Sequence, residues 1–339
     1  MKNKISYVTF FITIISLFIF NACKHDRLKI DISEIELTLE VYNFEKILFE
    51  NPHHEVYDLL LAQYNNHDEF IDIYTESVLQ IGNIEDEFMP EYLHSFLTDT
   101  VIRRTADTTL AVFEDFRPIA NAIEKGFKHY KHYFPDYSIP AIYTYISGFN
   151  ESLIIAENFI GISLDKYLGS KCEFYPMLGI PVYKSRNMYP QKIISDLFYA
   201  WAITEFQNND NAENLLSQMI HHGKLIYFTK AMNPSLPDSI IMGYTAEQIK
   251  WSKVNEASMW NYIVERREIY NSDRLLIQRY INDSPFTHTF SSESPGRTGI
   301  WLGWQIVTEF MNNNEDITLK ELMNMNNAQE ILNRSGYHP

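Results

Sequence analysis

At four places in the chain a histidine stands close to a second histidine or to an acid, and such groups can bind metal ions or transfer protons. Two imidazoles on one helix ligate a metal well at spacing i,i+4, whereas spacing i,i+3 requires a ligand from elsewhere. The zinc-protease signature HExxH is absent, because Asp58 stands where a second histidine would follow His54. We expect solvated helix faces, and no metal site, at His54-Glu55, His67-Asp-Glu69 and His129-x-x-His132. The fourth group is His221-His222.

The pair His221-His222 ends an apolar stretch and precedes the hydrophobic run LIYF. Adjacent residues on a helix point about 100° apart, so only one of the two imidazoles can face a given cleft. We take His222 as a candidate for a cleft or partner site. The competing interpretation is a histidine that is hydrogen-bonded at the surface or in the core.

A glycine-containing loop, Ser294 to Gly299, precedes a segment with helical spacing. Arg297 and the first amide groups of that helix could hold a carboxylate or another anion. The alternative is an internal cap in which Arg297 pairs with Glu293 or Glu256. Glu256 lies one turn before Trp260, where an unpaired buried carboxylate would be unfavourable. We predict that Arg297 and Glu256 meet, or that both line one cleft, with Trp260 as the neighbouring candidate.

The other reactive groups give weaker signals. Cys172 lies between a lysine and a glutamate and is expected to be packed or incidental rather than a nucleophile. The sequence has no GxSxG elbow, no Walker loop and no GxGxxG fingerprint. It has many carboxylates, but no spacing singles out a glycosidase pair. Tryptophans of the last third could line a ligand groove, although core packing is favoured: Trp251, Trp260, Trp301 and Trp304.

The sequence patterns of the segments that must position these residues predict an α+β fold dominated by helices. Apolar residues alternate with polar ones between Lys24 and Phe49, which predicts two short strands or one bent strand. Runs rich in β-branched and aromatic residues between 139 and 164 are broken by turn residues such as Gly148 and Asn158. They predict a small antiparallel sheet packed on a helical domain.

Helical spacing dominates the rest of the chain. Pro118 is expected to start or kink a long helix that runs to Phe134. Capping-box patterns at Thr245 and Thr318 predict helix starts. The predicted organisation is a signal peptide (1–22), a lipidated N-terminus with a β segment (23–50), a helical region (51–138) and an α+β region (139–339), the last two forming one compact domain.

The first 22 residues are typical of a bacterial lipoprotein signal. Lys2 and Lys4 precede a short apolar run, Ile5 to Phe20, and Cys23 follows at the expected cut, where it would carry lipid. The run is short for a membrane-spanning helix. Plain secretion and an uncleaved anchor are the alternatives. Removal of the signal deletes two lysines and no acid, so the formal charge changes from −16 to about −18. Such an acidic protein repels nucleic acid, which we exclude as a partner.

Several segments together resemble the gliding-motility lipoprotein family GldB of Bacteroidota, over nearly the whole chain. They are the lipoprotein signal, LDKYLG from Leu164, GYTAEQIKWSKVNEASMWNYIVE from Gly243, YNSD from Tyr270, SPF from Ser284 and ESPGRTGIWLGWQIV from Glu293. The resemblance implies a role in gliding motility and in the type IX secretion machinery, whose components would be the protein partners. It implies no catalytic residues.

Two of these segments are also similar, more remotely, to bacterial zinc metallopeptidases, in which HExxH on one helix is followed by a glutamate before a glycine. Here the corresponding helix is 192–206, which has no histidine, and His222 replaces the glutamate. Because zinc catalysis needs three protein ligands and a bound water, the resemblance implies a degenerate zincin-like scaffold without activity or cofactor.

The sequence therefore predicts a non-catalytic protein, held by lipid at Cys23 on the periplasmic face of the outer membrane. Only one acid follows the lipidation site in Lys24-His25-Asp26-Arg27, which favours the periplasmic face over surface export. The alternatives are a metallopeptidase-like hydrolase of the cell envelope and a ligand-binding lipoprotein.

Overall fold

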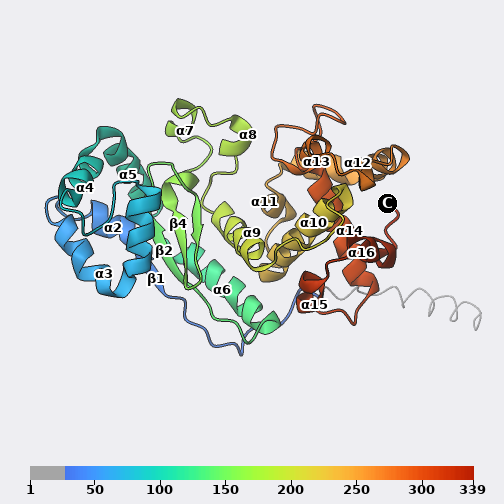
Figure 1. Cartoon of the computed structure of the whole chain (residues 1–339), viewed down its shortest axis with the longest axis horizontal. Helices are drawn as coiled ribbons and strands as arrows, with labels where there is room; N and C mark the ends of the chain where they lie inside the picture. Colours follow the sequence, from blue (N-terminus) through green and yellow to red (C-terminus); the bar gives the residue numbers. More distant parts are fainter. Residues whose placement is uncertain (1–26) are drawn as a thin grey trace, which may run out of the picture. The chain divides into compact units, whose positions relative to one another are not determined.

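The computed structural model describes residues 27–339, and contacts divide the chain into Met1–Asp31 and Ile32–Pro339. Every helix and strand given below belongs to the second unit (Figure 1). The predicted signal peptide and Cys23 lie outside the described residues. Among residues 27–339, no helix combines the length and apolarity that a membrane span requires.

In the described residues, four strands form one mixed sheet in the order β1-β2-β4-β3. The strands are β1 (Val41–Asn43), β2 (Ala141–Tyr145), β3 (Leu153–Ile155) and β4 (Phe159–Ser163). The helix-rich α+β class is confirmed, but the prediction of an antiparallel sheet is wrong. Strand β2 runs parallel to both β1 and β4, and the β3–β4 hairpin supplies the antiparallel pair.

A buried carboxylate explains why β2 and β4 run parallel. Asp165, directly after β4, accepts hydrogen bonds from the backbone amides of Ser147 and Phe149, at 3.2 and 2.7 Å. These contacts hold the chain that leaves β2 beside the end of β4, so the two strands share one direction. Ser163 also donates to Asp165, and burial raises the pKa of the Asp165 carboxyl.

The predicted strands between Lys24 and Phe49 are mostly absent. In residues 32–40 the alternating apolar side chains are half-buried and the polar ones exposed, but the segment pairs with no strand in the described residues. The alternation therefore comes from an extended segment with one side against the protein. Only Val41–Asn43 joins the sheet, and α2 (Phe44–Phe49) begins directly after it.

One face of the sheet is covered by N-terminal helices (Figure 1). Their buried side chains pack on Tyr143, Tyr145 and Phe159 in one hydrophobic cluster. These helices are α2, α3 (Val56–Asp72), the π-helix η1 (Ile73–Val78), α4 (Met89–Thr98) and α5 (Thr100–Val112).

Helices α6 and α9 lie on the other side of the sheet (Figure 1). Pro118 stands in the first turn of α6, which confirms its predicted role as a helix start. Between the sheet and α9 the chain forms short helical turns in a long connection. The elements here are α6 (Arg117–Tyr133), the 3₁₀ turn η2 (Leu164–Tyr167), α7 (Phe174–Met177), α8 (Val182–Ser185) and α9 (Lys192–Glu205).

The C-terminal half is built around two helices whose backbones touch. A Cβ added to Gly303 would lie 1.8 Å from the Met219 carbonyl oxygen, and one added to Gly223 would lie 2.4 Å from the Gly303 backbone. The two glycines thus permit this close crossing of α10 and α14. Both predicted capping boxes, at Thr245 and Thr318, are confirmed. The helices are α10 (Leu215–Met232), α11 (Asp238–Met242), α12 (Ala246–Glu265), the 3₁₀ turn η3 (Glu268–Tyr270), α13 (Arg274–Ile281), α14 (Thr298–Asn313), α15 (Leu319–Asn324) and α16 (Ala328–Ser335).

Candidate functional site

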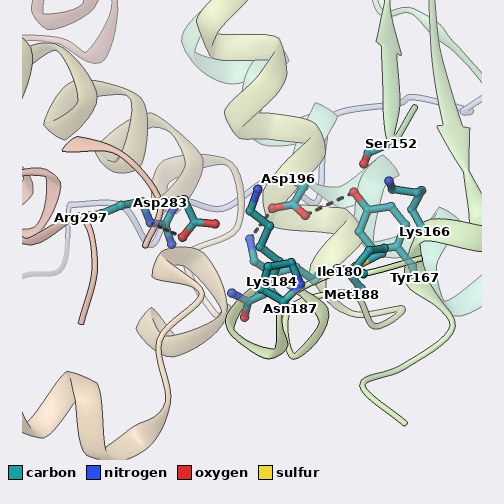
Figure 2. A pocket seen from close by; sticks show the side chains of 13 residues that line it. Ser152, Lys166, Tyr167, Ile180, Lys184, Asn187, Met188, Asp196, Asp283 and Arg297 are labelled. Carbon is teal, nitrogen blue, oxygen red and sulfur yellow. Dashed lines mark hydrogen bonds and ion pairs between the residues drawn. The ribbon is translucent and has the colours of Figure 1, made fainter. Parts of the chain in front are cut away.

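A charged cavity of about 570 Å³ opens beside the N-terminal ends of α9 and α14 (Figure 2). Its walls come from η2, the connection that carries α8, the first turns of α9 and the loop before α14. Six charged side chains line it, namely Lys166, Lys184, Lys192, Arg297, Asp196 and Asp283. A cavity of this volume is in the range of small-ligand sites.

The α9 wall carries a closed polar network. The buried Lys192 ammonium donates to Ser195 Oγ at 2.8 Å and forms an i,i+4 ion pair with Asp196. Asp196 also accepts a hydrogen bond from the Tyr167 hydroxyl at 3.3 Å. The positive charge of Lys192 is thus balanced within the wall.

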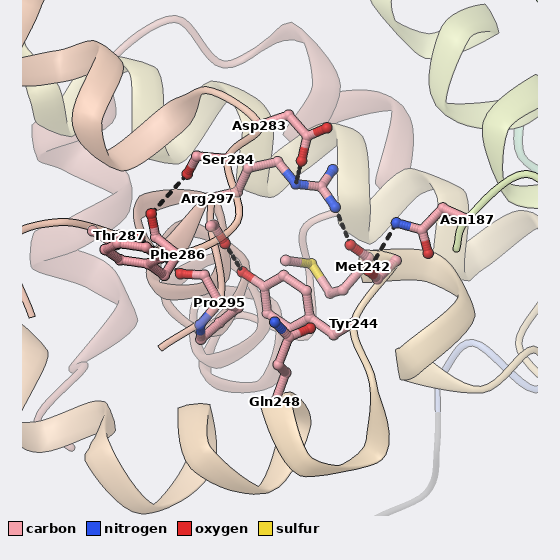
Figure 3. Close-up of polar contacts among 12 residues, drawn as sticks. Asn187, Met242, Tyr244, Gln248, Asp283, Ser284, Phe286, Thr287, Pro295 and Arg297 are labelled. Atoms are coloured by element: carbon pink, nitrogen blue, oxygen red, sulfur yellow. Dashed lines mark hydrogen bonds and ion pairs between the residues drawn. The ribbon is translucent and has the colours of Figure 1, made fainter. Parts of the chain in front are cut away.

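The α14 wall is built on Arg297, the residue that precedes the helix. Its backbone is left-handed, with φ of 57°, and its guanidinium donates to the Met242 carbonyl (Figure 3). Asp283 lies 3.9 Å from Arg297 Nε and is half exposed, so this ion pair is weak. Asn187 donates to the Gly243 carbonyl at 3.0 Å, which ties the α8 connection to the end of α11.

Positive charge exceeds negative charge in this region. The exposed ammonium of Lys184 forms, within the described residues, no hydrogen bond or ion pair beyond a ring contact with Tyr183. Arg186 lies near Arg297 without lining the cavity, and its Nε is a buried donor without a partner in the part of the chain that the structure describes. Burial lowers the pKa of both Arg186 and Lys166. Lys184 is therefore the cavity cation whose charge has no acceptor in the described residues.

His222 lies on α10 and faces α9, where its Nδ1 is 2.8 Å from the Tyr199 hydroxyl oxygen. Burial, together with the smaller effect of the nearby Arg297 charge, lowers the pKa of His222 to about 4. Burial also raises the pKa of Tyr199 to about 12. The pair is therefore neutral at pH 7 and joins α9 to α10 near the α14 wall.

The predicted pair of Arg297 with Glu256 does not form. Glu256 accepts hydrogen bonds from Trp301 Nε1 at 3.0 Å and from the Tyr337 hydroxyl at 2.9 Å. Trp260 packs edge-on against the Tyr337 ring, with centroids 5.3 Å apart. Arg297 lies in the cavity wall, whereas Glu256 and Trp260 do not line that cavity. The sequence did not reveal the C-terminal Tyr337 as the acid's partner.

The remaining candidate residues are packed or hydrogen-bonded within the fold. Trp301 and Trp304 are buried, as expected for core packing. Cys172 is half-buried, and burial raises the pKa of its thiol, which disfavours the reactive thiolate. His67 bonds to the Tyr143 hydroxyl and His129 to the Lys125 carbonyl. Over residues 27–339, no group of three histidine, cysteine or acidic side chains is placed to hold a metal ion.

Most of the residues that line the cavity were not identified from the sequence, although the charges of one segment could have marked them. Residues 166–192 contain three lysines besides Lys192 and one arginine, but Glu173 is their only acid. This local excess of positive charge is unusual in a chain of formal charge −16. It marks the connection that forms the cavity wall.

The fold and cavity define a helix-rich α+β protein with an open, charged cavity. The chain matches the family described as gliding motility protein GldB over residues 25–339, and it belongs to that family. It is thus a gliding-motility-related protein. No curated protein and no solved structure matches it.

Proposed function

We propose that this chain is a non-catalytic component of the gliding machinery, of type IX protein secretion, or of both, and that it acts by binding. Membership of the GldB family supports the link to motility. The short name of the family, GldB_lipo, suggests a lipoprotein, which supports lipid attachment at Cys23. The protein would lie on the periplasmic face of the outer membrane, with other components of the machinery as partners.

One observation carries the non-catalytic part of the proposal. Helix α9, which would correspond to the HExxH helix of a zinc peptidase, has no histidine. The lysine ammonium of Lys192 is bonded to both Ser195 and Asp196. A divalent cation beside the first turns of α9 would meet this positive charge, and the imidazole that faces α9 from α10 is that of His222. These donors do not fit a catalytic zinc ion.

The contact between Ser195 and Lys192 raises a second possibility, a serine–lysine hydrolase. The Lys192 nitrogen, which would have to accept the Ser195 proton, is instead bonded to the Asp196 carboxylate. Ser195 is also buried, and its hydroxyl lies 3.3 Å from the Ile240 carbonyl, which it can donate to. The hydroxyl is therefore poorly placed to attack a substrate in the cavity.

Complementation of a null strain tests the proposal. The wild-type chain is expected to restore gliding or secretion, and Cys23→Ala is expected to leave the outer-membrane fraction and to fail, because stable anchoring needs lipid chains at that cysteine. Cys172→Ala is the matched control and should behave as wild type. Normal fractionation and function of Cys23→Ala would refute the anchor. Stoichiometric zinc with proteolysis of casein by the purified protein would refute the non-catalytic role.

A further inference from the structure

The cations of the charged cavity point to a ligand that carries negative charge. The Lys184 ammonium lines this cavity and has no acceptor among the described residues. An incoming anion would supply the acceptor that this ammonium lacks within the protein. We propose that this cavity binds the free C-terminal carboxylate of a peptide that has apolar residues before its end.

The charges of the cavity favour an anion. Four cations and two carboxylates line it, so its surplus is about two positive charges. This surplus attracts a phosphate as well as a carboxylate, and the apolar part of the lining favours an anion that carries an apolar chain. The carboxylate of Asp283 already lies beside Arg297 in this region.

The size and edge of the cavity favour a peptide over a small acid. A volume of about 570 Å³ exceeds what one carboxylate needs. Ile180, Pro181 and Met188 form part of the lining. On the same connection the apolar side chains of Met177 and Val182 are 75% and 81% exposed. Apolar residues next to the bound carboxylate would cover this surface.

This inference rests on the proposed non-catalytic role, because the peptide must be held without being cut. The cavity lies beside the polar network on α9, so a catalytic version of this site would cleave a bound peptide. Binding and cleavage can be measured on the same sample. The two ideas can therefore fail separately.

The test uses the purified lipid-bearing protein in detergent and a fluorescein-labelled peptide, Gly-Ala-Leu-Phe, measured by fluorescence anisotropy. The free-acid peptide is expected to bind at least about tenfold more tightly than the same peptide with an amidated end. Lys184→Gln should weaken binding of the free acid about five- to tenfold, with little effect on the amide. Lys171→Gln, on the same connection but outside the cavity, is the matched control and should bind as wild type.

Equal affinity for the acid and the amide, or no binding of either, would overturn the inference and leave the proposed function standing. Displacement of the peptide by inorganic phosphate at lower concentration than by acetate would overturn the preference for a carboxylate. Cleavage of the bound peptide, seen by mass spectrometry, would instead overturn the non-catalytic role.

Discussion

Two polar clusters lie one helical turn apart on α14 and differ in whether their charges are satisfied. At the start of the helix, Arg297 belongs to the charged cavity, where cations outnumber acids. One turn later, Trp301 belongs to the Glu256 cluster, which we define as Glu256, Trp260, Trp301 and Tyr337. There each carboxylate oxygen of Glu256 accepts one hydrogen bond from a buried aromatic side chain.

The difference separates a structural role from a binding role. The Glu256 cluster joins α12, α14 and Tyr337, which lies two residues after α16, and its polar groups already have partners within the protein. Such a closed network stabilises the fold and offers little to a ligand. The charged cavity is open and contains the Lys184 ammonium, which has no acceptor in the described residues, so this group can still bond to a ligand.

The largest expected effect comes from disturbing the crossing of α10 and α14, because both clusters include residues at or on α14. Gly303→Ala would place a methyl group 1.8 Å from the Met219 carbonyl oxygen, so α10 and α14 must move apart. We expect a loss of about 4 kcal/mol or more in the free energy of unfolding, with both clusters disturbed. Urea unfolding measures it, and Gln305→Ala on the same helix is the control. A stable Gly303→Ala protein would show that the crossing is looser than described.

A smaller effect is expected in the closed cluster. Glu256→Ala leaves Trp301 Nε1 and the Tyr337 hydroxyl without their acceptor, which should reduce the free energy of unfolding by about 2–3 kcal/mol. Binding of the free-acid peptide should not change. Glu265→Ala, an exposed acid at the end of α12, serves as the control. If Glu256→Ala abolished peptide binding in a folded protein, the cluster would belong to the binding site.

The histidine near the cavity should make stability depend on pH. The pKa of His222 is about 4 in the folded protein, below its ordinary value of 6.5, so the unfolded chain binds the proton more readily. Stability is therefore full above about pH 6.5 and falls as the pH drops towards 4, by about 2 kcal/mol for this partly exposed side chain. In His222→Gln this slope should become shallower, whereas in His54→Gln, an exposed control, it should not change. An unchanged slope in His222→Gln would show that His222 is not held neutral.

Local patterns in the sequence were sufficient for many elements of the fold. The capping boxes at Thr245 and Thr318 and the role of Pro118 depend on residues within one helical turn, and all three were predicted. The direction of β2 depends instead on Asp165, which bonds to amides 16 and 18 residues earlier in the chain. Such distant pairing leaves no periodic signal.

The candidate site shows the same limit. Arg297 and His222 were identified because their local motifs stand out, but their partners were not. Glu256 was assigned to Arg297 on charge alone, whereas the fold gives it the hydroxyl of Tyr337, 81 residues away. Charge complementarity could not choose between a cation and two neutral donors, because both satisfy a half-buried carboxylate.

A double-mutant cycle of Arg297→Ala and Glu256→Ala tests the separation of the two clusters most directly. The free energies of unfolding of wild type, both single variants and the double variant are measured in urea. Because the two side chains share no hydrogen-bond partner, we predict that their effects add to within about 0.5 kcal/mol. A coupling energy above about 1 kcal/mol would mean that Arg297 and Glu256 interact, and it would contradict the assignment of one to binding and the other to structure.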